Sequence, residues 1–132
     1  MSAILLDASA FSAMRRDNKK IRAAINKASL VVISPIMIAE LSYGFLKGSR
    51  QQENFDYLDH FINDTGIMWA DIDLDTADRY ALIWQTLRKQ GTPVPINDVW
   101  LAALGWQRGY EILTLDSHFK NIPQAALVQL PS

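Results

Sequence analysis

Short apolar stretches that do not alternate with polar residues recur along the chain, and patterns that favour helices separate them. An uninterrupted apolar run is typical of a strand that is buried on both faces of a parallel sheet. We therefore predict an α/β fold, with an open parallel sheet of four to five strands and helices on both faces. The predicted strands lie in AILLD (3–7), SLVVISP (29–35), GIMWAD (66–71) and YEILTLD (110–116), with AALVQL (125–130) as the candidate fifth strand.

Three of the predicted helices carry recognisable capping residues. Ser34 is a good N-cap, and Pro35 is a good first residue, for a helix that follows the second strand. Asp75 is suited to cap the start of a helix that Gly91 ends, and Gly109 is suited to end the helix before the last strand. Helices at these positions are the crossovers that parallel strands require.

The bulk properties bound the class of protein. A length of 132 residues fits one domain, 1–132, that is large enough for a hydrophobic core. No apolar run approaches the roughly 20 residues of a membrane span, so we expect no membrane association. The absence of cysteine excludes disulfides and thiolate metal sites, and it suits a cytoplasmic protein. With a formal net charge of −1, any attraction to nucleic acid must be local.

Four carboxylates are predicted to meet at one edge of the sheet. Asp7 and Asp116 each end a strand, and functional sites of open parallel sheets form at the carboxyl ends of the strands. Asp98 begins the helix before the Asp116 strand, and Glu40 lies in the second turn of the helix after the second strand. Carboxylates held this close repel one another unless a cation binds between them. Oxygen ligands of this kind favour Mg²⁺ or Mn²⁺.

Each carboxylate also has a simpler interpretation. An Asp after a strand is usually a turn residue or a helix cap, and Asp98 fits an N-cap equally well. Glu40, next to an apolar stripe, fits a solvated helix residue. The functional interpretation is favoured because four acidic residues with unrelated roles would otherwise have to lie at one edge of one sheet by chance.

Three segments resemble a known family. LLDAS, ISPIMIAELSYG and PINDVWLAALGWQRGYEILTLDSHF resemble the PIN-domain ribonucleases, and within them the VapC-type toxins of toxin–antitoxin pairs. The resemblance covers nearly the whole chain in the family's order, and its last segment is the most specific. It implies a single PIN-like nuclease domain, a homodimer, and an antitoxin protein that blocks the cleft. It also implies Mg²⁺- or Mn²⁺-dependent hydrolysis of phosphodiester bonds in RNA.

The resemblance assigns roles to individual residues. The acidic positions of the family fall on Asp7, Glu40, Asp98 and Asp116. Of these, Asp7, Asp98 and Asp116 would hold the metal ion, and Glu40 would complete the site or position the attacking water. Supporting residues that orient carboxylates or water would be Ser9, Thr114 and Asn97.

Basic residues gather in the segment MRRDNKKIR. A local patch there would contact RNA phosphates, although a solvated helix face explains the same residues. The candidate RNA contacts are Arg15, Arg16, Lys19 and Lys20. His118 follows Asp116 by two residues and is a weaker candidate for the cleft.

Two other classes of protein remain open. A non-catalytic PIN-like module that binds RNA or a partner would keep the cleft without metal-dependent turnover. A receiver-type signalling domain would have a similar length and fold, but it needs a Lys at the end of its fifth strand. AALVQLPS supplies no Lys, and Asp98 and Asp116 would be left unexplained.

Overall fold

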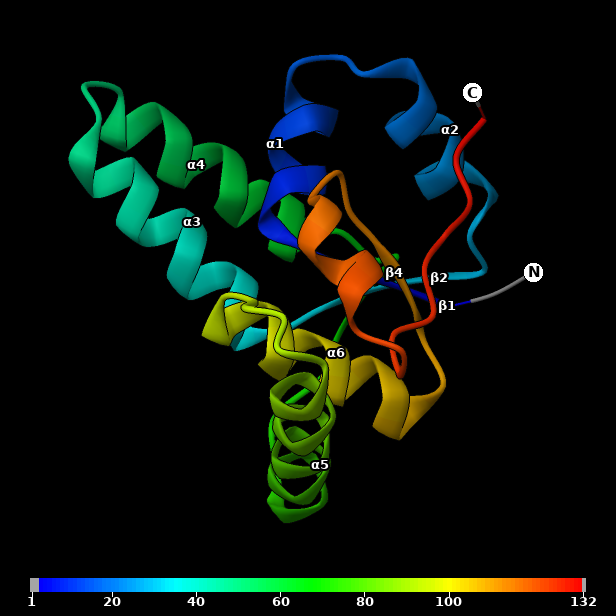
Figure 1. Cartoon of the computed structure of the whole chain (residues 1–132). Helices are drawn as coiled ribbons and strands as arrows, with labels where there is room; N and C mark the ends of the chain where they lie inside the picture. Colours follow the sequence, from blue (N-terminus) through cyan, green and yellow to red (C-terminus); the bar gives the residue numbers. More distant parts are fainter. Residues whose placement is uncertain (1–2, 132) are drawn as a thin grey trace.

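The computed structural model describes residues 3–131 and contains one four-stranded parallel sheet with the strand order β3-β2-β1-β4 (Figure 1). The strands are β1 (Ala3–Leu6), β2 (Leu30–Ile33), β3 (Ile67–Trp69) and β4 (Glu111–Leu113). The candidate fifth strand is wrong, because Leu127 makes only an isolated parallel bridge with Ile112. The C-terminal segment exchanges only two backbone hydrogen bonds with β4, and both of them involve Ile112.

Helices connect the strands, and most of the predicted caps are present. The helices are α1 (Ala8–Arg15), α2 (Lys19–Lys27), α3 (Pro35–Lys47), α4 (Gln51–Ile62), α5 (Leu74–Gln90), α6 (Ile96–Arg108) and the short 3₁₀ helix η1 (Ser117–Asn121). Ser34 caps α3, and Gly91 and Gly109 end α5 and α6 in the left-handed conformation, with φ of 69° and 72°. The cap of α5 is Asp73 and not Asp75, since Asp73 forms a reciprocal capping box with Thr76.

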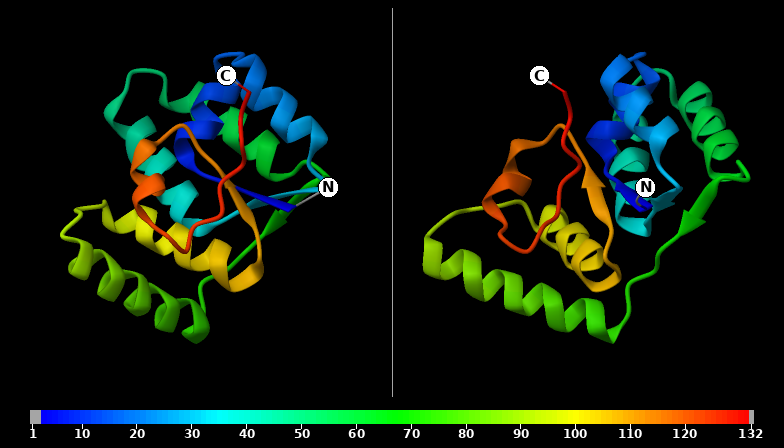
Figure 2. Two further views of the ribbon diagram at one scale, coloured as in Figure 1. Left: turned by 45° about the vertical axis from the view of Figure 1, so that its right-hand side comes forward. Right: turned by 90° about the vertical axis from the view of Figure 1, so that its right-hand side faces the viewer.

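The sheet is covered on both faces, as predicted. Alternate strand residues enter two separate cores: Leu5 and Val32 face α5 and α6, whereas Ile4 and Ile33 face α1 to α4. The right-hand view of Figure 2 shows these two helical layers on either side of the strands. Among residues 3–131, no helix combines the length and the apolar character that a bilayer span demands.

The α6 helix is nearly enclosed, which fixes the position of its first turn. Its residues from 98 to 105 are buried apart from Trp100. A Cβ atom on Gly105 would lie 3.3 Å from both Ile112 Cγ1 and the Tyr110 carbonyl oxygen, so glycine permits close packing of α6 on β4. Close packing of α6 therefore fixes the position of Asp98, which lies near enough to Asp7 after β1 and Asp116 after β4 to interact with their charges.

Candidate functional site

Asp7 is the first residue after β1, and donors hold both of its carboxylate oxygens. The Ala10 backbone N–H donates to Oδ1 at 2.9 Å, so Asp7 is indeed the N-cap of α1. The Ser9 hydroxyl donates to Oδ1 at 2.8 Å, and the Thr114 hydroxyl donates to Oδ2 at 2.6 Å. Burial raises the pKa of the Asp7 carboxyl even though these hydrogen bonds favour its charged form. A capping role therefore does not exclude Asp7 from the site.

Ser9 and Thr114 also tie the end of β1 to the loop that follows β4. Thr114 Oγ1 accepts the backbone N–H of Asp116 at 2.8 Å, and Ser9 Oγ accepts that of Leu115 at 3.0 Å. The two hydroxyls thus fix the loop that carries Asp116 relative to Asp7. Asn97, the third predicted supporting residue, is exposed in the first turn of α6, and its side chain makes no hydrogen bond to another residue within residues 3–131.

Asp98 lies in the first turn of α6, one turn away from the cap position that Pro95 occupies, so it is not an N-cap. The residue is only 7% exposed. Its Oδ2 atom is buried and has no hydrogen-bond partner among the described residues. Burial, followed by the negative charge of Asp116, raises the pKa of Asp98 to about 8. A buried carboxyl oxygen without a partner is costly, so Asp98 Oδ2 is an atom that a bound ligand could satisfy.

Asp116 and Glu40 complete the acidic group. Burial would raise the pKa of Asp116, but hydrogen bonds from the His118 backbone N–H and from Asp98 outweigh it, so this pKa lies below its ordinary value. Partial loss of hydration raises the pKa of Glu40, and the charges of Asp7 and Asp116 raise it further. Asp7 and Glu40 in turn both contribute to the raised pKa of Asp98. The four carboxylates therefore lie close enough to interact electrostatically, although they come from four separate segments.

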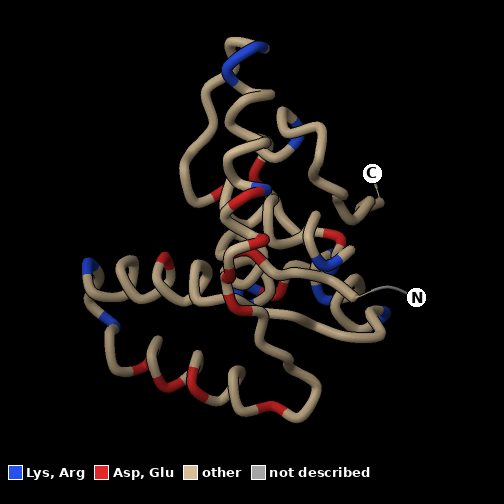
Figure 3. Tube along the Cα trace, turned by 90° about the horizontal axis from the view of Figure 1, so that it is seen from below, with Lys and Arg blue, Asp and Glu red and all other residues tan. Residues whose placement is uncertain are grey.

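Figure 3 shows acidic positions gathered near the centre of the view, where these segments meet. Asp98, Asp116 and His118 form a group that could hold a metal ion, since their ligand atoms lie within 4.8 Å of one another. Asp7 lies outside this tight group, with both oxygens already bound by donors. His118, which the sequence pattern marked only weakly, is the residue that structure adds to the predicted four.

The family model for the PIN domain matches residues 4–125 of the chain. The chain belongs to the PIN domain family. The resemblance seen in the three sequence segments is therefore confirmed for the family, and the four acidic residues all fall within the matched range.

Relatives of this PIN domain span most of its length. Ribonuclease VapC4 of Mycobacterium tuberculosis is 28% identical over 98 residues, which cover 74% of this chain and 75% of that protein. Ribonuclease VapC5 of the same organism is 27% identical over 126 residues, which cover 96% of this chain and 92% of that protein. A crystal structure of DNA-bound VapBC from Salmonella typhimurium contains a chain with a TM-score of 0.84, at 27% identity. That match covers 97% of this chain and 98% of the other.

The predicted basic patch of this PIN domain is divided. Asp17, with a φ of 63°, forms the turn that ends α1 and separates Arg15 and Arg16 from the lysines of α2. Arg15 donates to Asn54 and stacks over the Tyr57 ring, so it takes part in packing. Arg16 is exposed, and the two arginines line a groove with Arg50 and Phe45. Lys19 is exposed, and Lys20 lines a different pocket beside the C-terminal segment.

Proposed function

We propose that this PIN domain is an endoribonuclease that hydrolyses RNA phosphodiester bonds at the acidic cluster, and that it acts as the toxin of a toxin–antitoxin pair. The observation that carries the proposal is the convergence of Asp7, Glu40, Asp98 and Asp116 at the carboxyl edge of the sheet. The ribonuclease names of its relatives VapC4 and VapC5 support the same reaction class.

The donor set fits a divalent metal ion, and the unpartnered Asp98 Oδ2 atom provides a place for one. Carboxylate oxygens are the ligands of Mg²⁺ and Mn²⁺, so one of these ions is the proposed cofactor. Asp98 and Asp116 would hold the ion, with Asp7 beside them. Such an ion supplies positive charge to a phosphate and lowers the pKa of a bound water.

Other residues of the chain would accept a proton, orient Asp7 and contact the RNA. Glu40 is the carboxylate at the exposed side of the cluster, and its raised pKa suits a group that accepts a proton from the attacking water. Ser9 and Thr114 would keep the Asp7 carboxylate in one orientation. Arg15 and Arg16, with Arg50, would contact RNA phosphates in their groove, at the end of α1 away from Asp7. Lys19 and Lys20 would contribute at longer range.

The partners of the chain are part of the proposal. VapBC complexes, such as the DNA-bound one from Salmonella typhimurium, support an antitoxin protein as the partner. A homodimer and action in the cytoplasm, where RNA is found, complete the proposal. Co-expression with a small antitoxin-like protein, should a neighbouring reading frame encode one, tests the partner. A stable complex with reduced cleavage is expected, and two proteins that purify separately would contradict the proposal.

Cleavage of cellular RNA by the purified chain, free of partner, tests the reaction. The assay compares Mg²⁺, Mn²⁺ and EDTA for the wild type and for Asp98→Asn, with Asp78→Asn on α5 as the matched control because Asp78 is exposed and remote. Loss of the Asp98 charge should lower the rate by about 100-fold or more, while the control keeps full activity. Equal cleavage by the wild type and Asp98→Asn would point to a contaminating nuclease. RNA binding without cleavage in any metal would favour a non-catalytic binding module.

A further inference from the structure

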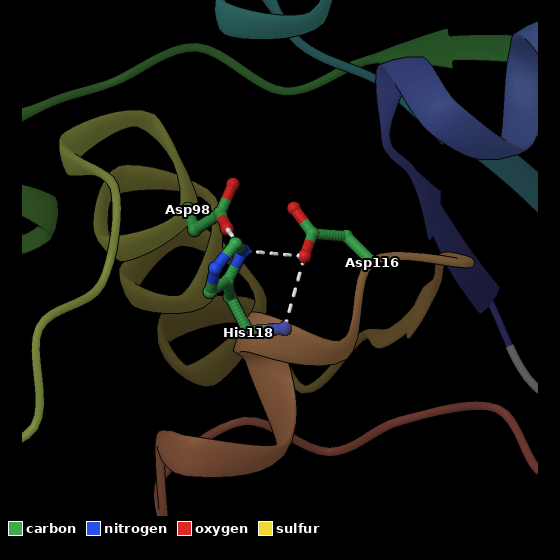
Figure 4. A group of neighbouring side chains, drawn as sticks. All are labelled: Asp98, Asp116 and His118. Atoms are coloured by element: carbon green, nitrogen blue, oxygen red, sulfur yellow. Dashed lines mark hydrogen bonds and ion pairs between the residues drawn. The ribbon is translucent and has the colours of Figure 1, made fainter.

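The His118 imidazole lies between two carboxylates of the cluster (Figure 4). Its Nδ1 atom is 2.7 Å from Asp116 Oδ1 and 3.9 Å from Asp98 Oδ2. Asp98 comes from α6, and Asp116 and His118 come from the start of η1, so the three meet only in the folded chain. No role follows for His118 from the acidic pattern of the sequence, yet its ring contacts Asp116 and lies near Asp98.

The fold holds His118 in this place by two means. The backbone N–H of His118 donates to Asp116 Oδ1 at 2.9 Å, which starts η1 with Asp116 as its cap. The next residue, Phe119, is 1% exposed and anchors η1 in the core. With the turn fixed at both positions, the imidazole of His118 points toward the carboxylates, while its side chain stays about half exposed to solvent at 52%.

A simple His–Asp pair does not account for Asp98. The 2.7 Å contact satisfies His118 and Asp116, but it leaves the buried Asp98 Oδ2 atom without a hydrogen-bond partner among the described residues. The 3.9 Å gap from Asp98 Oδ2 to His118 Nδ1 is too long for a hydrogen bond. Two ligands of one ion with bonds of about 2.1 Å lie roughly 3 to 4 Å apart, and this gap falls in that range. A cation bound to Asp98 Oδ2 and to the unprotonated His118 Nδ1 atom would satisfy Asp98, and it would replace the contact between His118 and Asp116.

We propose that His118 supplies a nitrogen ligand at the metal site, beside Asp98 and Asp116, which makes the centre a mixed nitrogen–oxygen site. This inference rests on the metal site of the proposed function and goes beyond its four carboxylates. Imidazole favours the later first-row metals over Mg²⁺. The site should therefore bind Mn²⁺ and Co²⁺ more tightly than Mg²⁺, and His118 should be the source of that preference.

Pulsed electron paramagnetic resonance of the Mn²⁺-loaded, tag-free protein tests the ligand directly, because imidazole nitrogen modulates the Mn²⁺ echo. The chain has two histidines, His118 and His60, and His60 lies on α4 with its Nδ1 atom 2.8 Å from the Asp56 carbonyl oxygen. His60→Gln is therefore the matched control. Imidazole modulation should appear in the wild type and in His60→Gln, and it should vanish in His118→Gln.

Calorimetric titration of the same three proteins provides the second readout. His118→Gln should lose about tenfold in Mn²⁺ affinity and clearly less in Mg²⁺ affinity, so that the preference for Mn²⁺ shrinks. Mn²⁺ that binds to the wild type without nitrogen modulation would overturn the role of His118 and leave the carboxylate site intact. A wild type that binds no Mn²⁺ would overturn both this inference and the metal site beneath it.

Discussion

Replacing Asp98 with asparagine should stabilise the metal-free protein at neutral pH. Asp98 is 7% exposed, and its pKa is raised to about 8 by burial and then by the charge of Asp116. The unfolded chain releases this proton at the ordinary value near 3.8. Between these values the folded protein holds a proton that the unfolded chain has lost, so its stability falls as the pH rises. Asparagine keeps the shape of the side chain and cannot ionise.

The size of the effect follows from the proton count. One proton more in the folded state changes the free energy of unfolding by about 1.4 kcal/mol per pH unit. From pH 5 to pH 7, both inside the window, the wild type should lose about 3 kcal/mol through Asp98. The raised pKa values of Asp7 and Glu40 add a loss of the same sign, which the variant keeps. Below about pH 4 the contribution of Asp98 is absent, and above about pH 8 the loss is complete.

Urea unfolding in EDTA at pH 5, 6, 7 and 8 measures this difference. The variant Asp98→Asn should show a shallower decline than the wild type, and the gap between the two should widen toward pH 8. Asp78→Asn, on the exposed face of α5, should follow the wild type at every pH. Parallel curves for the wild type and Asp98→Asn would refute the claim that Asp98 is a buried carboxyl with a raised pKa.

Three further perturbations test the site and the fold. Thr114→Val removes the hydroxyl that holds Asp7 and Asp116. The free energy of unfolding should fall by about 1–3 kcal/mol, and RNA cleavage should slow about 10- to 100-fold. Unchanged stability and cleavage would contradict this role. Gly91→Ala forces an alanine into φ of 69°, so it should lower the free energy of unfolding by about 1 kcal/mol with cleavage unaffected; equal stability would refute the strain. Mn²⁺ at about 100 times its dissociation constant should raise the free energy of unfolding of the wild type by about 2.7 kcal/mol, measured by thermal unfolding. A similar gain in Asp98→Asn at the same Mn²⁺ concentration would mean that the ion binds elsewhere.

Much of the fold could be predicted because the decisive signals are local. Unbroken apolar runs mark the four strands, and Ser34, Gly91 and Gly109 mark helix ends through their own backbone preferences. The cap of α5 was harder to predict, because the choice between Asp73 and Asp75 depends on which of them forms reciprocal hydrogen bonds with Thr76. The meeting of the carboxylates followed from topology, since parallel strands bring their carboxyl ends to one edge.

The parts that the sequence did not predict depend on packing between distant segments. His118 points into the cluster because Phe119 is anchored in the core, which no local pattern reveals. The sequence of the basic segment 14–22 predicts one patch, but the turn at Asp17 places Arg16 and Lys20 on different surfaces. Burial of Asp98 Oδ2 likewise depends on how α6 packs in the folded chain.

The central claim is that the carboxylates form one divalent metal site, and anomalous diffraction from crystals grown with Mn²⁺ tests it most directly. The account predicts an Mn²⁺ peak at bonding distance from carboxylate oxygens of Asp98 and Asp116. Mn²⁺ found only at other acidic positions, such as Asp73 and Asp75 at the start of α5, would contradict the account. So would an empty cluster at a Mn²⁺ concentration that supports RNA cleavage.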